Sequence, residues 1–177
     1  MPYDGQYTQQ MYAQQMIDEY IEMDIDPEDV WPQSFNIDDA IYWIEHTDFG
    51  EQVVLLDERY NDNATSTFEE YSVYLKQASD AGVHIVAPHM SMLVQQDESA
   101  AFGLVESDYT KVAKQNGLEI ITWTLERISP YDFWDRREGS VYELLYVLAH
   151  NVEILGIHTD WPAPVTFFAN CMNLGLK

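Results

Sequence analysis

The residues of this sequence that could perform acid–base chemistry are few, and its histidines are the first candidates. A histidine can transfer protons or bind a metal near neutral pH. Among the five histidines, His89 and His158 are the ones at or near the ends of predicted strands, where a site could form. No pair of histidines has the spacing of a zinc-binding motif. Two interpretations of His89 therefore stay open: a catalytic residue, or an ordinary polar residue at the start of a loop.

Charged residues near the predicted strand ends offer a second set of candidates. Asp57 and Glu58 directly follow a predicted strand, and they could face the mouth of a pocket or be solvated charges. The acidic run at 22–29 lacks the glycine and the twelve-residue register of an EF-hand, so we interpret it as a solvated face. Arg136 and Arg137 could attract a phosphate, but ion pairs with the acidic residues beside them are the simpler interpretation.

The overall charge excludes several classes of partner. Eight Lys and Arg residues face 31 Asp and Glu residues, which gives a formal net charge of −23. Such a charge repels nucleic acid and anionic membrane surfaces. No apolar stretch approaches the roughly 20 residues that span a bilayer, and residues 1–15 lack the pattern of a signal peptide. The single cysteine, Cys171, lies in an apolar run and is expected to be a buried hydrophobic residue. The cellular compartment stays open.

Five short apolar runs predict the strands that would position these residues. They comprise residues 30–35, 52–56, 83–87, 118–123 and 154–159. The third and fourth runs are nearly continuous in valine and isoleucine. This is typical of strands that are buried on both faces of a parallel sheet.

Segments of helical periodicity alternate with these strands. Predicted helices span residues 8–23, 37–46, 67–81, 108–116, 141–150 and 163–173. Asn36, Ser107 and Ser140 precede helices as N-cap candidates, and Gly82 and Gly117 follow helices as C-terminal signals. Repetition of strand, loop and helix predicts one parallel α/β domain over residues 1–177.

The predicted loops are asymmetric about the strands. Long loops follow the strands at 57–66, 88–106 and 125–139, whereas short turns at Gly82 and Gly117 precede them. In an α/β barrel, the loops after the strands build the active site. The functional face is therefore predicted at the carboxyl ends of the strands.

Three segments carry a resemblance to a known family. Residues 111–124 read as a helix, a Gly-Leu pair, a strand and then Trp123-Thr124. Residues 156–162 read Gly-Ile-His-Thr-Asp-Trp-Pro, and Ser34-Phe35 ends the first predicted strand. In order and spacing, these segments resemble the Trp-Thr block, the closing Gly-Ile-x-Thr-Asp-x-Pro and the Ser-Phe of the glycerophosphodiester phosphodiesterases. The resemblance spans most of the chain from Val30 onward.

The resemblance implies both a fold and an activity. The family forms a phospholipase C-like (β/α)8 barrel. With a divalent cation, it hydrolyses glycerophosphodiesters to an alcohol and glycerol 3-phosphate, a reaction of lipid and glycerol metabolism. The five predicted strands would correspond to barrel strands four to eight. The expected fold is therefore a partial TIM-type (β/α) barrel of five parallel β/α units, the C-terminal portion of the family's barrel domain with the N-terminal units missing.

The family's reactive groups are expected upstream of these five units. The resemblance places His-Arg-Gly, Glu-x-Asp with a following His-Asp, and Glu-x-Lys on strands one to three, and none of these motifs occurs in this sequence. They supply two acid–base histidines and the metal-binding carboxylates. Without proton transfer and metal stabilisation, phosphodiester hydrolysis slows by orders of magnitude. We therefore expect no catalytic residue and no metal ligand in this truncated chain, which alone should be inactive; calcium or magnesium belongs to the full-length family.

The candidate substrate-binding residues follow from the same resemblance. It implies that Trp123 lines the apolar side of the glycerol or alcohol pocket, although a core tryptophan is the alternative. Phe35 and Ser34 end a strand, where side chains alternate between the barrel interior and the helix layer. Gln33 could reach a ligand or satisfy a buried backbone group. Asp160 could orient a substrate hydroxyl, but before a helix that begins with proline an N-cap is the simpler interpretation.

Two rival interpretations remain alongside the phosphodiesterase. One is a non-catalytic remnant that acts as a binding or interaction module, and the other is an unrelated, doubly wound α/β sheet. In a partial barrel the edge strands at 30–35 and 154–159 lose their neighbours. We therefore expect self-association through these open edges, aggregation, or dependence on an N-terminal partner. The expected ligand of the complete enzyme is a glycerophosphodiester, whose alcohol moiety the sequence leaves open, as it does the metal.

Overall fold

The computed structural model describes residues 7–59, 68–125 and 140–175, and its centre is a sheet of five parallel strands. The sheet order is β1-β2-β3-β6-β7, and each strand pairs in parallel with the next. The strands are β1 (Gln33–Ser34), β2 (Val54–Asp57), β3 (Ile85–Pro88), β6 (Glu119–Thr122) and β7 (Gly156–Ile157). The prediction of a parallel α/β fold is therefore confirmed.

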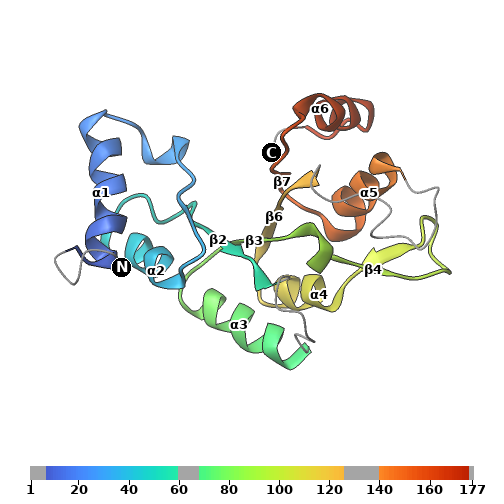
Figure 1. Ribbon diagram of the computed structural model, residues 1–177, viewed down its shortest axis with the longest axis horizontal. Helices are drawn as coiled ribbons and strands as arrows, with labels where there is room; N and C mark the ends of the chain where they lie inside the picture. Colours follow the sequence, from blue (N-terminus) through green and yellow to red (C-terminus); the bar gives the residue numbers. More distant parts are fainter. Residues whose placement is uncertain (1–6, 60–67, 126–139, 176–177) are drawn as a thin grey trace.

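Helices flank the sheet along its whole length. They are α1 (Gln9–Glu22), α2 (Ile37–His46), α3 (Phe68–Asp80), α4 (Asp108–Gln115), α5 (Val141–Val147) and α6 (Pro162–Cys171). A π-helical turn, Leu148–Val152, extends α5. Figure 1 shows α1 and α2 at one end of the molecule, α5 and α6 at the other, and α3 beside α4 between them. Within the described residues, none of the helices has the length and apolar character needed to cross a bilayer.

Local chemistry fixes where the helices start and stop. The side chains of Asn36 and Ser107 accept hydrogen bonds from backbone N–H groups in the first turns of α2 and α4. Ser140 forms a reciprocal capping box with Glu143 at the start of α5. Gly82 follows α3 with φ +88°, a left-handed conformation that costs glycine little, and so turns the chain into β3. These caps are confirmed predictions.

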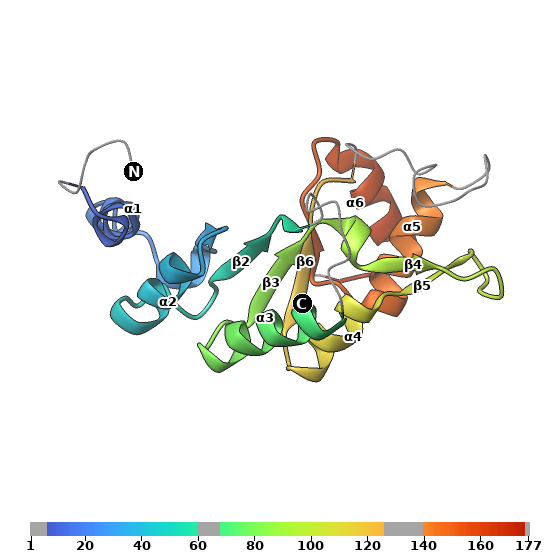
Figure 2. The ribbon, with the colours of Figure 1, turned by 60° about the horizontal axis from the view of Figure 1, so that its bottom comes forward.

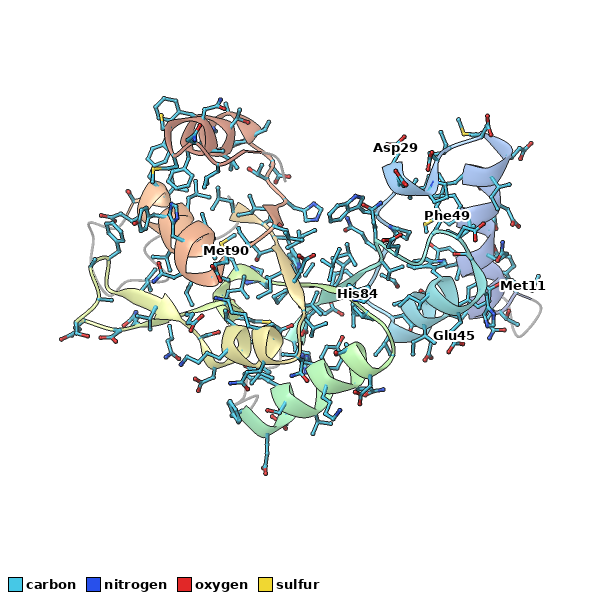
Figure 3. All side chains as sticks on the ribbon, turned by 180° about the vertical axis from the view of Figure 1, so that it is seen from behind. Met11, Asp29, Glu45, Phe49, His84 and Met90 are labelled. Atoms are coloured by element: carbon cyan, nitrogen blue, oxygen red, sulfur yellow. The ribbon has the colours of Figure 1, made fainter. Side chains whose placement is uncertain are left out.

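Two hydrophobic clusters cover the two faces of the sheet. The larger lies between the sheet and the helices and extends from Phe49 beside α1 to Met90 toward α5 (Figure 3). The smaller lies on the opposite face of the sheet, which we call the inner face. It comprises Val54, Ile85, Ala87 and Ile121, with Leu56 and Trp123 packed against it. Side chains of a strand alternate between faces, so Asp57 shares the helix-facing side of β2 with Leu55.

The inner face of the sheet is concave. Phe35 follows β1 and Trp123 follows β6, so β2 and β3 lie between them. Three strand spacings amount to roughly 14 Å along the sheet. Nevertheless, the ring centroids of Phe35 and Trp123 are 6.0 Å apart. The curvature of the sheet, together with the length of these side chains, closes that distance.

The structure corrects two predictions, one about the first strand and one about the loop that follows the third predicted strand. The first strand, predicted at 30–35, is reduced to Gln33–Ser34, because only these residues pair with Val54 and Leu55 of β2 and Pro32 has no N–H for the ladder. The segment predicted as a long loop at 88–106 holds a 3₁₀ turn, Met90–Met92, and an antiparallel hairpin. That hairpin, β4 (Val94–Gln96) with β5 (Leu104–Glu106), projects away from the sheet (Figure 2).

The prediction that Cys171 is buried is wrong. Cys171 ends α6 and is exposed. Phe168 is the buried residue of α6, whereas Phe167 is 60% exposed. The apolar run was interpreted as core, but α6 packs mainly against α5, where Tyr142 contacts the rings of Phe167 and Phe168.

Candidate functional site

Three aromatic side chains meet at the carboxyl ends of the strands. Phe35 follows β1, His89 follows β3 and Trp123 follows β6. The ring of Trp123 is nearly perpendicular to both others, at 87° to Phe35 with centroids 6.0 Å apart and at 79° to His89 with centroids 5.0 Å apart. We call Phe35, His89 and Trp123 the aromatic cluster. It lies on the concave face, at the end of the strands where the sequence predicts function.

Hydrogen bonds between β3 and β6 hold the Trp123 ring in place. Its Nε1 donates to the carbonyl oxygen of Ala87 at 2.8 Å. The backbone N–H of Met90 donates to the carbonyl oxygen of Trp123 at 3.1 Å, and His89 and Trp123 form a parallel bridge. The indole is therefore anchored across the inner face, partly buried and in contact with the inner hydrophobic cluster. The packing of Trp123 against the inner hydrophobic cluster is observed, and its role as the wall of a pocket stays a prediction.

His89 is the most buried member of the aromatic cluster. It is 4% exposed, and burial lowers the pKa of its imidazole below 6.5. The ring is therefore largely neutral at pH 7. Its Nδ1 accepts a hydrogen bond from the backbone N–H of Ser91 at 3.3 Å and lies 2.7 Å from the Ser91 hydroxyl oxygen. With Nδ1 as an acceptor, the neutral ring carries its proton on Nε2.

Ser34 and Gln33 are placed differently from Phe35. The Ser34 hydroxyl donates to Asp39 Oδ2 at 2.8 Å and accepts from the backbone N–H of Asn36 at 3.0 Å. Asp39 is 4% exposed and also accepts hydrogen bonds from the Gln9 amide. The Ser34 side chain therefore connects the end of β1 to α2. The side chain of Gln33 is exposed.

Asp160 follows β7 and is exposed, and the prediction that it caps the next helix is wrong. The N-cap residue of α6 is Trp161, which makes no side-chain capping bond. Instead, the hydroxyl oxygen of Thr159 accepts from the backbone N–H of Trp161 at 3.2 Å. The N-cap residue of α6 therefore lies one position after Asp160, the residue that the sequence predicted.

A buried ion pair at the end of β2 escaped the sequence analysis. Asp57 accepts from Arg59 Nε at 2.8 Å and from Arg59 Nη2, and its Oδ2 also accepts from the Tyr109 hydroxyl at 3.0 Å. The Arg59 guanidinium lies 3.7 Å from the centroid of the Tyr74 ring. We call Asp57, Arg59, Tyr74 and Tyr109 the Asp57 cluster. It occupies the helix-facing side of the sheet, so Asp57 is neither a solvated charge nor directed toward the concave face.

The three partners of Asp57 in the cluster all have raised pKa values. Burial opposes the charge of Arg59, but the hydrogen bond and charge of Asp57 outweigh it and raise the pKa of the guanidinium. Burial, with the Asp57 charge adding to it, raises the pKa of Tyr74 to about 12 and that of Tyr109 well above its usual value. All three groups keep their protons at neutral pH. The arrangement joins the end of β2 to α3 and α4 through Tyr74 and Tyr109.

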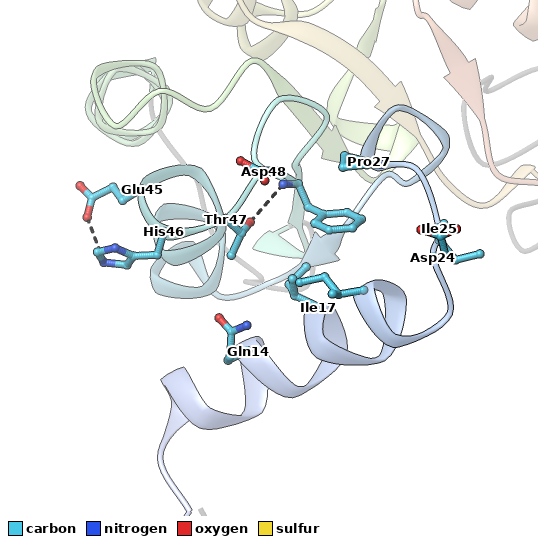
Figure 4. Close-up of a pocket in the computed structure, with 11 residues that line it drawn as sticks. Gln14, Ile17, Asp24, Ile25, Pro27, Glu45, His46, Thr47 and Asp48 are labelled. Carbon is cyan, nitrogen blue, oxygen red and sulfur yellow. Dashed lines mark hydrogen bonds and ion pairs between the residues drawn. The ribbon is translucent and has the colours of Figure 1, made fainter.

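A separate hollow lies at the opposite end of the strands. It has a volume of about 670 Å³ and lies between the C-terminal half of α1 and the turn that precedes β2 (Figure 4). Its lining includes Ile17, Ile21, Asp24, Asp48 and Phe49. None of the predicted substrate-binding residues borders it. The hollow and the aromatic cluster are therefore distinct.

The divalent cation implied by the family resemblance does not fit the residues seen here. Within residues 7–59, 68–125 and 140–175, no group of three His, Cys, Asp or Glu residues is placed to hold a metal ion. Arg136 and Arg137, considered above as a phosphate-attracting pair, lie outside the described residues.

Comparison with known proteins identifies a relative of the chain. No protein-family model matches the chain. A protein of Arthroderma benhamiae named "Extracellular protein" is 36% identical over 189 aligned residues, which cover 98% of this chain and 76% of the relative. The alignment extends across all five strands and the whole of the aromatic cluster.

Proposed function

The chain belongs to one family with the extracellular protein of Arthroderma benhamiae, and from the resemblance of residues 34–35, 111–124 and 156–162 we propose that it is the C-terminal part of a glycerophosphodiester phosphodiesterase barrel. In the complete enzyme, glycerophosphodiesters would be hydrolysed to an alcohol and glycerol 3-phosphate. The observation that carries the proposal is the aromatic cluster on a concave parallel sheet. A site at the carboxyl ends of the strands is the arrangement that α/β barrels use.

The order of the strands supports a barrel over a doubly wound sheet. The five parallel strands follow one another across the sheet in the order of the chain, without a reversal. A doubly wound sheet reverses its strand order and binds ligands where the reversal occurs. A barrel adds each strand beside the previous one, and its inner face is concave. A partial (β/α) barrel, corresponding to barrel strands four to eight, therefore accounts for both observations.

The chain's own residues would bind and orient the substrate. Trp123, fixed by its hydrogen bond to Ala87, would form the apolar wall beside the alcohol moiety. Phe35 would extend this wall across the concave face, beside His89. The acid–base histidines and the metal-binding carboxylates would come from barrel strands one to three. Alone, this chain would bind without catalysing.

An activity assay tests whether this chain binds the substrate while barrel strands one to three supply the catalytic groups. Glycerophosphocholine with calcium or magnesium is offered to the 177-residue chain and to a longer form that supplies the three preceding barrel strands. We expect turnover by the longer form only. Turnover by the short chain would contradict the assignment of chemistry to the missing strands. An inactive longer form that still binds the diester would favour the non-catalytic binding module.

The open edges of the sheet predict how the isolated chain behaves. Within the described residues, β1 and β7 are the edge strands, and each has a neighbour on one side only. Unpaired edges of a sheet tend to pair with other chains. We therefore expect dimers or aggregates in analytical ultracentrifugation. A monomer with a cooperative melting transition and no binding of a dye for apolar surface would contradict this expectation.

The name of the relative supports an extracellular location, which we extend to this chain as part of the proposal. An antibody against the chain should then detect it in the culture medium of the source organism. Detection in the cell fraction alone would contradict the proposal.

A further inference from the structure

The hollow between α1 and the turn that precedes β2 has walls that packing holds in place. The indole Nε1 of Trp43 in α2 donates to the carbonyl oxygen of Ala13 in α1 at 3.0 Å. The ring of Phe49, in the turn, stacks against Tyr20 of α1 with centroids 5.8 Å apart. These contacts tie the walls to each other, so the hollow of about 670 Å³ is present without a partner. A preformed site spares its partner the cost of ordering it.

The lining of the hollow changes from buried to exposed along α1. Ile17 is 0% exposed, whereas Ile21 and Ile25 are 61% and 36% exposed. Figure 4 shows Ile17 on α1 and Ile25 in the turn that follows the helix. Met23, which lies between Ile21 and Ile25 in sequence, is 72% exposed. Exposed apolar side chains that border a hollow are typical of a surface where another molecule binds.

The formal charge at this end of the molecule is negative throughout. Residues 1–58 contain 15 of the 31 Asp and Glu residues and none of the eight Lys and Arg residues. They therefore hold −15 of the formal net charge of −23, and they include α1 and α2 at one end of the molecule (Figure 1). Asp24 and Asp48 line the hollow, and neither forms an ion pair with another described residue. Their carboxylates are available to a cationic partner.

The charge and the shape together favour one kind of occupant. A second copy of the chain would bring two acidic ends together, and an anionic partner would be repelled in the same way. Met23 adds exposed apolar surface outside the lining, which favours a partner longer than a small organic cation. A helix beside α1 can lay apolar side chains into the hollow and place lysines or arginines at its rim. We infer that the hollow binds a basic amphipathic helix of another protein. This interaction is independent of the proposed function.

Synthetic peptides are the probes for this interaction. A fluorescent peptide of about 18 residues carries leucine and lysine with helical periodicity, and two others replace its leucines by serine or its lysines by glutamate. Their binding to the 177-residue chain is followed by fluorescence anisotropy at two salt concentrations. We expect the leucine–lysine peptide to bind about tenfold more tightly than the serine–lysine peptide, and the leucine–glutamate peptide not to bind. Equal affinities of the two lysine peptides would show attraction to the acidic surface alone and overturn the inference.

A matched pair of variants localises the apolar contact. Ile21→Ser should weaken binding of the leucine–lysine peptide by about threefold to tenfold, because the partner then buries less apolar surface. The control is Val73→Ser, since Val73 is 69% exposed, against 61% for Ile21, and lies on α3. Val73→Ser should leave binding unchanged. Equal effects of the two variants would place the peptide elsewhere and reject the hollow as its site.

A second pair of variants localises the charge. Asp24→Asn combined with Asp48→Asn should weaken binding at low salt by about threefold and reduce its dependence on salt. Glu69→Gln combined with Glu98→Gln removes the same charge from exposed residues of α3 and of the β4–β5 hairpin. This control should have the smaller effect. If both double variants weaken binding equally, the peptide responds to the field of the whole protein and the inference fails.

Two further outcomes would assign the hollow to another occupant and overturn the inference. One is displacement of the leucine–lysine peptide by an equal concentration of hexylamine, which would indicate a site for a small organic cation. The other is a monomeric Ile21→Ser variant beside a dimeric natural chain in analytical ultracentrifugation, which would indicate a second copy of the chain.

Discussion

Replacing Arg59 by methionine tests the ion pair of the Asp57 cluster. The side chain of Asp57 is 2% exposed and that of Arg59 is 23% exposed, so the pair is largely shielded from water. The substitution leaves Asp57 with Tyr109 as its side-chain hydrogen-bond partner in the cluster. Removal of one partner from a buried ion pair costs about 3–5 kcal/mol. Loss of the cation–π contact with Tyr74 adds about 1 kcal/mol. We expect a total loss of about 5 kcal/mol.

Denaturant unfolding and thermal melting measure this loss. For a chain of 177 residues, each kcal/mol lowers the melting temperature by roughly 2–4 °C, so Arg59→Met should lower it by about 15 °C. The matched control is Lys76→Met, which removes a cation from the ion pair with Asp80. In that pair the two side chains are 64% and 63% exposed. Exposed pairs of this spacing contribute about 0.3–0.5 kcal/mol.

A double variant separates the loss of charge balance from the loss of packing. Asp57→Asn combined with Arg59→Met removes the unpaired charge, and the amide oxygen can still accept from the Tyr109 hydroxyl. It should be more stable than Arg59→Met alone. If Arg59→Met is no more destabilising than Lys76→Met, or if the double variant regains nothing, the ion pair is not buried as described.

Three further outcomes follow from individual residues. The exposed thiol of Cys171 should react stoichiometrically with a thiol reagent in the native protein, and reaction only after unfolding would contradict its exposure. Burial lowers the pKa of His89, so the unfolded chain protonates first as the pH falls, and stability should decrease below pH 6.5. Unfolding free energies at pH 5 and pH 7.5 should therefore differ less for His89→Gln than for the natural chain, and an unchanged difference would refute this. A Cβ on Gly50 would lie 2.5 Å from the Cα of Ile44, whereas one on Gly156 meets nothing within 4 Å. Gly50→Ala should thus destabilise by a few kcal/mol and Gly156→Ala by little. Similar melting temperatures for these two variants would contradict the packing around Gly50.

The parts of the fold that could be predicted from sequence depend on short-range chemistry. Asn36 and Ser107 cap helices through groups two or three residues away, and Gly82 turns the chain through its own backbone. The helix Ile37–His46 was predicted with both its bounds. The strands were recognisable because burial on both faces requires continuous apolar residues.

The parts that could not be predicted depend on long-range partners. Asp57 and Tyr109 are 52 positions apart, and no local pattern indicates that they meet. The hairpin after β3 has strands of three residues each, which are too short for an alternating pattern of apolar and polar residues to be recognised. Cys171 is exposed because α6 buries so little of its apolar surface, which a hydrophobic run alone does not reveal.

The candidate site falls between these two cases. Resemblance to a family identified Trp123 and Phe35 as binding candidates, but only the curvature of the sheet brings their rings together. His89 joins them because the pairing of β3 with β6 places it beside Trp123. Ser34, adjacent to Phe35 in sequence, points to the other side of the strand and bonds to Asp39.

The central claim is that the carboxyl ends of these strands form one wall of a phosphodiesterase site. The most direct test is the kcat/KM for glycerophosphocholine of the longer form that supplies the three preceding strands, with Trp123→Ala compared against Trp31→Ala. Trp31 is 41% exposed and precedes β1, at the opposite end of the strands. We predict that Trp123→Ala lowers kcat/KM at least tenfold and that Trp31→Ala changes it less than twofold. Equal effects of the two variants would contradict the claim.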